Sequence, residues 1–297
     1  MKNRQLFRGA VCTMLGGVCW GFSGTCGQYL FANHEITTLQ LTCIRLLSAG
    51  VILFLISLIK YRDTLKNIWK YPRDVVLLVC YGLFALMFNQ YAYMTSVAWN
   101  NAATTTMMQN LSLVTVMLLT CLYLRRRPTG REVLALVLAL FGVYMIATGG
   151  NPTQMVMSRQ GLLWGLCTTL AATVYTLLPR PLLRRWPQVP ILACGMLLGG
   201  AVMNITAKSW TFQLNLALSG WLAIAAIVLF GTVLSFTLFL QGIKDLGPVK
   251  TAMLAVTEPV SATIFAAAWL GTKFSVSDLI GFAAILATIF LLSKEPE

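Results

Sequence analysis

Two charged side chains interrupt the apolar runs of this sequence, and their chemistry suits the binding of a small molecule. Arg45 is the ninth residue of the run Thr37–Ile59, and Glu258 is the eleventh residue of the run Pro248–Leu270. Because a helix rises about 1.5 Å per residue, each side chain is expected near the middle of a membrane-spanning helix. Ionisable groups at that depth are costly to bury and mark functional sites.

Arg45 and Glu258 admit three interpretations. A guanidinium that orients an anionic group and a carboxylate that binds a cationic group would together suit a zwitterion such as an amino acid. Alternatively, the two residues serve packing alone, either as a buried ion pair or with each bonded to backbone carbonyls and amides, or one of them acts without the other. Pro259 directly follows Glu258 and lacks a backbone donor, so we expect a helix break one turn earlier and a hinge beside Glu258.

Uncharged polar side chains recur inside neighbouring apolar runs. Asn89 lies within the third run, and Gln109 and Asn110 lie within the fourth. Amide groups can donate and accept hydrogen bonds to a polar solute, but they can equally bond between helices, which contributes about 0.6–2 kcal/mol each. Both roles therefore stay open for these three residues.

Aromatic side chains complete the set of candidates. Rings suit the walls of a site for apolar, ring-bearing or quaternary-ammonium groups, although most aromatic residues in membrane proteins serve packing or the lipid interface. The candidate substrate-binding residues are Trp20, Arg45, Phe88, Asn89, Gln109, Asn110, Trp164, Tyr175 and Glu258.

The composition requires lipid as the solvent for most of the chain. Of the 297 residues, 58% are hydrophobic and 10% are charged, whereas a soluble domain is about a quarter charged. These values exclude a soluble enzyme, a disordered chain and a disulfide-stapled secreted protein. The sequence contains no recognisable nucleotide-binding loop or catalytic cluster, and its eight cysteines all lie within apolar runs. We therefore expect no enzyme activity, no cofactor and no metal site.

Ten apolar runs are long enough to cross a membrane, since a hydrocarbon core of about 30 Å requires a helix of about 20 residues. They are too long and too uniform for the alternating strands of a barrel, so the predicted fold is all-α with ten transmembrane helices. The runs are Gly9–Phe31, Thr37–Ile59, Asp74–Val97, Asn101–Tyr123, Arg131–Thr148, Gln160–Pro179, Pro190–Ala207, Gly220–Ile243, Pro248–Leu270 and Ser277–Ser293.

The lysines and arginines supply an independent test of this topology. Of the 22 lysines and arginines, eighteen lie in alternate segments, from the N-terminus to the tail that contains Lys294. Three lie in the other loops, and Arg45 lies within a span. Positively charged loops stay in the cytoplasm, so both termini are predicted to be cytoplasmic. The net charge of +13 then reflects topology and contacts with anionic lipids, and no nucleic-acid binding is expected.

The two halves of the chain resemble each other in hydropathy and in a few residues. Trp20 aligns with Trp164, and Asn110 aligns with Glu258 at a separation of 148 residues. Each half contains five of the ten runs. Because five is an odd number, the second half enters the membrane from the opposite side, which gives the inverted repeats common among secondary transporters.

The boundaries of these repeats follow from the polar segment at mid-chain. We expect a first five-helix repeat over 1–148, an external linker over 149–158 and a second five-helix repeat over 159–297. A central site between two such repeats can open to either side of the membrane in turn.

These features together resemble the drug/metabolite transporter superfamily, in particular its EamA-type ten-helix members. The resemblance rests on the W-G pairs that begin at Trp20 and Trp164, on T-E-P-V at Thr257–Val260, and on the order of the ten runs. The segment Gly150–Thr153 (G-N-P-T) resembles bacterial inner-membrane transporters of the YicL kind. The resemblance implies a multi-pass carrier of the bacterial cytoplasmic membrane, with the first, third, fourth, sixth, eighth and ninth helices lining its path. The first run lacks the glutamate of the small four-helix relatives, so their proton-exchange mechanism is not implied.

The function expected from the sequence is secondary transport by alternating access. The solutes would be amino acids or related amphipathic metabolites, with export the expected direction and protons a candidate coupling ion. Two alternatives stay open, namely an uncoupled facilitator or channel for small polar solutes and a carrier of cationic or quaternary-ammonium compounds. A scaffold without transport is disfavoured by the polar interior. The expected partners are a small-molecule substrate and membrane lipids, with a monomer or homodimer as the assembly.

Overall fold

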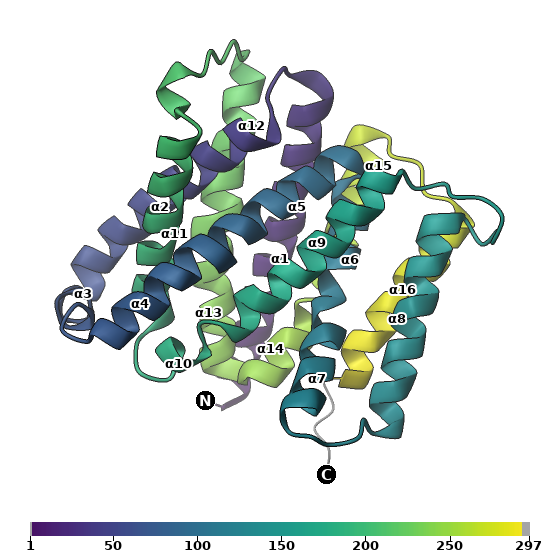
Figure 1. The fold of residues 1–297 in the computed structure, drawn as a ribbon, viewed down its shortest axis with the longest axis horizontal. Helices are drawn as coiled ribbons and strands as arrows, with labels where there is room; N and C mark the ends of the chain where they lie inside the picture. The colour runs from purple at the N-terminus through teal and green to yellow at the C-terminus, as the bar shows by residue number, and fades with distance from the viewer. Residues whose placement is uncertain (1, 293–297) are drawn as a thin grey trace.

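The computed structural model of the chain describes residues 2–292, and over that range it consists of helices and connecting loops, without strands (Figure 1). Two predictions reach beyond these residues. Ser293, the expected end of the last run, and Lys294, the last of the cytoplasmic basic residues, both lie outside the described part of the chain.

The helices follow the apolar runs closely. Their bounds are α1 Lys2–Asn33, α2 Thr38–Lys60, α3 Arg62–Ile68, α4 Pro72–Cys80, η1 Tyr81–Met87, α5 Phe88–Trp99, α6 Ala102–Asn110, α7 Ser112–Tyr123, α8 Gly130–Thr148, α9 Arg159–Leu177, α10 Arg180–Leu183, α11 Gln188–Thr206, η2 Ser209–Thr211, α12 Leu218–Val228, η3 Leu229–Leu234, α13 Ser235–Leu246, α14 Pro248–Leu254, α15 Thr257–Leu270 and α16 Val276–Leu292.

Eight helices among the described residues are long and apolar enough to cross a membrane. They comprise α1, α2, α8 and α11 together with the joined segments α4–η1–α5, α6–α7, α9–α10 and α12–η3–α13. The ninth predicted run appears as the two shorter helices α14 and α15, and the tenth appears as α16 with 17 residues. The all-helical membrane fold is therefore confirmed, whereas the count of ten spans stays a prediction.

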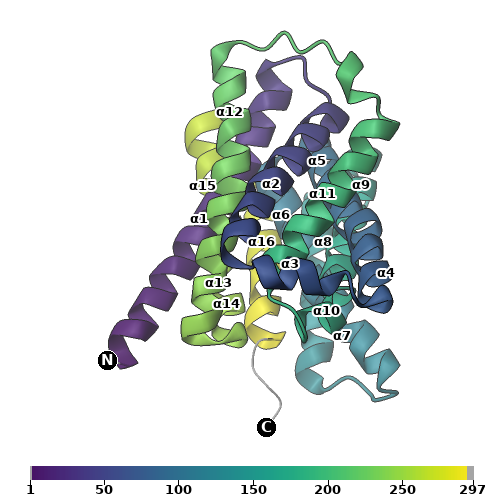
Figure 2. The same ribbon diagram turned by 90° about the vertical axis from the view of Figure 1, so that its left-hand side faces the viewer.

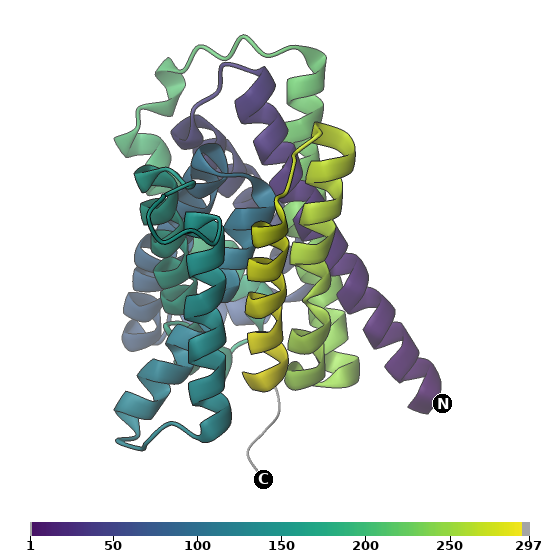
Figure 3. The same cartoon turned by 90° about the vertical axis from the view of Figure 1, so that its right-hand side faces the viewer.

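The helices of the two halves pack against each other in matching pairs. α1 packs along α13 and α15, and its counterpart α9 packs along α5 and along α6 and α7. α2 packs along α11, and α8 packs along α16 at one side of the bundle (Figures 1 and 3). The main contacts of α1 thus have equivalents in those of α9.

A π-helical turn recurs in the two halves at the same separation. η1 begins at Tyr81 and η3 begins at Leu229, so they are offset by the 148 residues that also separate Asn110 from Glu258. Each π-turn is continuous with an α-helix on both sides. π-turns inside α-helices are rare and frequently mark functional sites.

One end of the bundle collects the basic segments. α1 begins there, α16 ends there, and α3, α10 and the junction of α13 with α14 lie at the same end (Figures 1 and 2). Asp74 at this end accepts hydrogen bonds from Arg185 (3.1 Å) and from the indole N–H of Trp186 (2.8 Å). The Arg185 guanidinium also lies over the Tyr71 ring at 4.6 Å. These contacts fasten the start of α4 to the loop before α11. We call this end the basic end.

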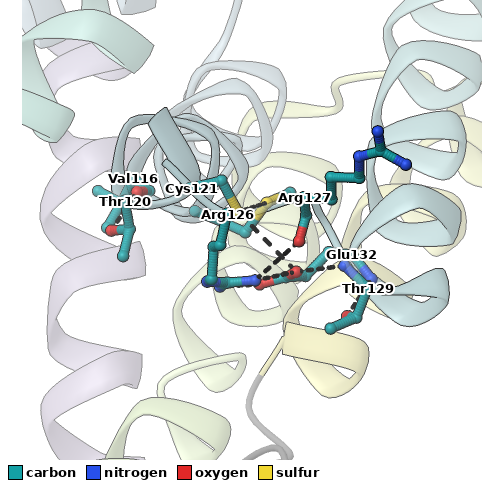
Figure 4. A network of polar contacts seen from close by, with 8 residues as sticks. Val116, Thr120, Cys121, Arg126, Arg127, Thr129 and Glu132 are labelled. Carbon is teal, nitrogen blue, oxygen red and sulfur yellow. Dashed lines mark hydrogen bonds and ion pairs between the residues drawn. The ribbon is translucent and has the colours of Figure 1, made fainter. Parts of the chain in front are cut away.

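A polar network fixes the connection between α7 and α8, also at the basic end. Arg126 donates two hydrogen bonds to the Glu132 carboxylate, at 2.8 and 2.6 Å (Figure 4). Thr129 and Glu132 form a capping box, in which the Thr129 side chain accepts from the Glu132 backbone N–H and the carboxylate accepts from the Thr129 backbone N–H. Glu132 therefore both begins α8 and holds the preceding basic loop against it.

The α8–α16 pair shows how closely the helices approach. A Cβ added at Gly142 would lie 2.9 Å from the Gly281 carbonyl oxygen, and one added at Gly281 would lie 2.8 Å from the Gly142 carbonyl oxygen. The two helices thus cross at a point where only hydrogen atoms separate their backbones. Small residues at such crossings are typical of helix packing in membranes.

Replacing Gly142 with valine should separate α8 from α16 and destabilise the protein by about 1–3 kcal/mol, the usual effect of overpacking. The matched control is Gly130→Ala at the start of α8, where an added Cβ has no neighbour within 4 Å. Thermal unfolding in detergent should give a lower melting temperature for Gly142→Val and an unchanged one for Gly130→Ala. Equal melting temperatures would contradict this packing.

Candidate functional site

A cavity of about 330 Å³ lies among the central helices and collects most of the predicted site residues. The predicted residues that line it are Trp20, Arg45, Asn89, Gln109, Asn110, Tyr175 and Glu258. They come from both halves of the chain, on α1, α2, α5, α6, α9 and α15. Residues far apart in the sequence thus line one cavity.

Two broken helices bring polar groups to this cavity. α6 ends at Asn110 and α7 begins two residues later, while α14 ends at Leu254 and α15 begins at Thr257. The second break lies one turn before Pro259, as the sequence predicts. Glu258 consequently lies in the first turn of α15, where the positive end of the helix dipole stabilises a negative charge.

Arg45 is held inside the bundle without a charged partner. Its side chain is 6% exposed, and its Nε and Nη1 atoms have no hydrogen-bond partner among the described residues. No nitrogen of Arg45 lies within 4.0 Å of a Glu258 oxygen, so the buried ion pair considered from the sequence is absent. Both charges instead face one cavity. A buried, unpaired guanidinium is energetically unfavourable unless a ligand or water completes its bonds.

Phe88 and Trp164 lie outside the cavity wall. Phe88 is 42% exposed, because Asn89 and Gln90 take the cavity-facing side of the helix and successive residues turn by about 100°. Trp164 packs edge-on against the Tyr91 ring at 5.6 Å between ring centroids. The alignment of the two halves does not specify which face of each helix meets the cavity. These two residues lie on other faces than the remaining candidates.

Several lining residues were not among the predicted candidates. Tyr93 lies one turn after Asn89 on α5, a spacing that could have identified it. Phe236 and Phe239 on α13 surround Trp20, with ring centroids 5.3 and 5.1 Å away. Because the two phenylalanines are three residues apart, their rings lie on the same face of α13. The sequence alone does not show that this face packs against Trp20.

The cavity extends toward the basic end and is closed at the other. Gln188, the first residue of α11, belongs to its lining and lies beside the basic loop after α10. Toward the opposite end, the hydroxyl of Tyr93, a lining residue, bonds to the Thr106 hydroxyl of α6 at 3.0 Å. The lining of the cavity therefore reaches the basic end, whereas a hydrogen bond between α5 and α6 lies toward the other end.

Gln28 of α1 joins three segments beyond the closed end of the cavity. Its amide nitrogen donates to the Thr272 hydroxyl (2.9 Å) in the loop before α16. Its amide oxygen accepts from the backbone N–H of Ala102 (3.0 Å), the first residue of α6. That N–H has no partner within its own helix, so Gln28 satisfies it while connecting α1, α6 and the loop. We call this set of contacts the outer closure.

The chain belongs to the EamA-like transporter family, which it matches over residues 7–148 and again over residues 159–294. It is accordingly a multi-pass membrane transporter, and the cavity lies between the two segments that match the family.

Two curated relatives cover nearly the whole chain. The chain is 32% identical to the uncharacterized inner membrane transporter YicL of Salmonella typhimurium, over 97% of this chain and 96% of that protein. It is 22% identical to the uncharacterized transporter YwfM of Bacillus subtilis, over 95% and 93% of the two chains. A solved crystal structure matches with a TM-score of 0.64 at 16% identity, over 95% of this chain and 96% of that one, which speaks for the fold alone.

Replacing Gln28 with alanine should loosen the outer closure, because the variant loses the bonds to Thr272 and to the Ala102 backbone. Hydrogen exchange should become faster at the start of α6 and in residues 271–275, since local opening controls exchange. The control is Asn33→Ala, whose side chain bonds only to the Tyr29 carbonyl of its own helix. Exchange rates in Gln28→Ala that match those of the wild type would refute this role.

Proposed function

We propose that this protein is a secondary transporter that moves amino acids or related amphipathic metabolites across the bacterial inner membrane by alternating access. The relative YicL is named as an inner membrane transporter, and we extend that location to this chain. The basic end is proposed to face the cytoplasm, because basic loops are retained there. Export is the proposed direction, since the lining of the cavity reaches Gln188 at that end.

One observation carries the choice of substrate class. Arg45 and Glu258 line the same cavity, neither side chain has a hydrogen-bond partner among the described residues, and they do not pair with each other. A solute with one anionic and one cationic group would neutralise both charges at once. Trp20 and Tyr175 offer apolar contact to the rest of such a molecule, which favours amphipathic solutes.

The proposed mechanism requires two inverted five-helix repeats, over 1–148 and 159–297, joined by an external linker over 149–158. Three features support this arrangement. The family matches twice with nearly the same boundaries, the π-turns η1 and η3 are offset by 148 residues, and α1 and α9 have equivalent packing partners. Two such halves can exchange packings, which opens the central cavity to each side in turn.

Replacing Arg45 with glutamine should weaken the binding of amino acids by roughly ten- to a hundredfold, because a charged hydrogen bond contributes about 1.5–3 kcal/mol. A thermal-shift screen of purified protein against amino acids, polyamines, choline-like cations and nucleosides first identifies the ligand. The matched control is Arg159→Gln, which alters an exposed arginine at the start of α9. Unchanged affinity in Arg45→Gln would exclude Arg45 from the site.

Glu258 is the proposed site of proton coupling. Replacing it with glutamine removes the titratable group while keeping the shape of the side chain, so transport in proteoliposomes should lose its dependence on pH. Glu35→Gln is the control, since Glu35 is exposed in the loop between α1 and α2. A pH dependence that persists in Glu258→Gln would reject proton coupling through this residue.

A carrier of cationic or quaternary-ammonium compounds is the second candidate function. The cluster of Trp20, Phe236 and Phe239 lines the same cavity as Glu258, and aromatic faces with a carboxylate attract such cations. An uncoupled facilitator is separated from either carrier by counterflow in proteoliposomes. Substrate on the far side accelerates exchange through a carrier and has no such effect on a channel.

A further inference from the structure

Three side chains that line the cavity carry buried polar atoms without hydrogen-bond partners. These atoms are Ser23 Oγ on α1, Arg45 Nε and Nη1 on α2, and Asn89 Oδ1 on α5. The three residues are 2%, 6% and 9% exposed. Because a buried polar group without a partner is strongly disfavoured, the three groups together indicate a ligand that supplies the missing bonds.

Ser23 differs from the other buried hydroxyl groups of its own helix. Thr13 donates to the Gly9 carbonyl (2.9 Å) and Thr25 donates to the Gly21 carbonyl (3.0 Å), each four residues earlier on α1. Bonding of this kind is the usual way in which a hydroxyl is satisfied inside a membrane helix. The Ser23 hydroxyl makes no such bond, although Ser23 belongs to the lining of the cavity.

Ser23 and Arg45 both lie close to Gly231 in the π-turn η3. Gly231 in this turn has no side chain, and a Cβ there would overlap the Ser23 hydroxyl and lie 3.7 Å from Arg45 Nη2. The Ser23 hydroxyl therefore occupies space that any other residue at position 231 would fill. One hydroxyl donor and one guanidinium thus lie on adjacent sides of Gly231.

The geometry points to an oxyanion subsite formed by Ser23 and Arg45, which binds the carboxylate of the transported solute. The guanidinium supplies a fork of N–H donors that matches a carboxylate, and the Ser23 hydroxyl supplies one donor more. Glu258 in the same cavity disfavours a dianion such as phosphate, so the subsite selects a monocarboxylate. Asn89 Oδ1 remains as an acceptor for a donor group on the same solute. This inference rests on the proposed role of the cavity in transport.

Two matched series of probes test the subsite by calorimetry with the full-length protein in detergent. The first comprises L-phenylalanine, 3-phenylpropanoate and 2-phenylethylamine, and the second comprises L-leucine, 4-methylpentanoate and 3-methylbutylamine. In each series the amine lacks only the carboxylate of the amino acid. The wild-type protein should bind each amino acid more tightly than its amine. In each series, Ser23→Ala should weaken the binding of the amino acid and of the carboxylate that lacks an amine about tenfold. The binding of the amine should stay unchanged.

Ser57→Ala is the control, because Ser57 is a buried serine that donates to the Leu53 carbonyl of its own helix and lies outside the cavity lining. It should change none of the affinities. Amines that bind the wild type as tightly as the amino acids would overturn the subsite while leaving a cation transporter possible. An equal loss for all probes in Ser23→Ala would also overturn it, since the serine would then be merely structural. If no probe binds, both the subsite and the proposed amino-acid substrate fail.

Discussion

The structure depends on keeping two opposite charges apart inside an apolar bundle. Arg45 and Glu258 enter the same cavity from α2 and α15, yet no bond joins them. In a low-dielectric interior such a pair would normally collapse into contact or be replaced by apolar residues. The helix dipole at the start of α15 compensates Glu258 in part. The guanidinium has no equivalent support, so one side of the cavity carries a positive charge without a partner among the described residues.

Irregular backbone makes this cavity possible. The helix breaks after Asn110 and Leu254 place polar groups at mid-depth, and the π-turns η1 and η3 alter the helical register at equivalent places in the two halves. Backbone of this kind is tolerated inside a membrane only against protein or a water-filled space. Each half thus contains one π-turn and one such helix break. Two similar halves with similar irregularities are well suited to exchange conformations around a fixed site.

The two ends of the bundle are held by different kinds of contact. At the basic end, Asp74 of α4 forms an ion pair with Arg185 in the loop before α11, and Asp245 of α13 forms one with Arg8 of α1. At the other end, neutral bonds from Gln28 and Tyr93 close the space above the cavity. Neutral hydrogen bonds between membrane helices contribute only about 0.6–2 kcal/mol each. Breaking the outer closure would therefore have a modest energetic cost, as the proposed alternating access requires.

The sequence predicts the helices and most of the cavity but not the rotation of individual side chains. Charge and polarity at mid-depth identified Arg45, Glu258 and Asn110, because lipid makes such groups rare. Phe88 and Trp164 are candidates only through their positions along the chain, and in the structure their side chains lie outside the cavity lining. Ser23 could not be recognised, because a serine in a membrane helix normally bonds to its own backbone.

The most direct test of the account is a structure of the protein with a bound amino acid that it transports. In that structure the carboxylate of the solute should lie at Arg45 and its ammonium group toward Glu258, with the two protein side chains still separated. A bound structure in which Arg45 and Glu258 pair directly, with the solute elsewhere, would contradict it.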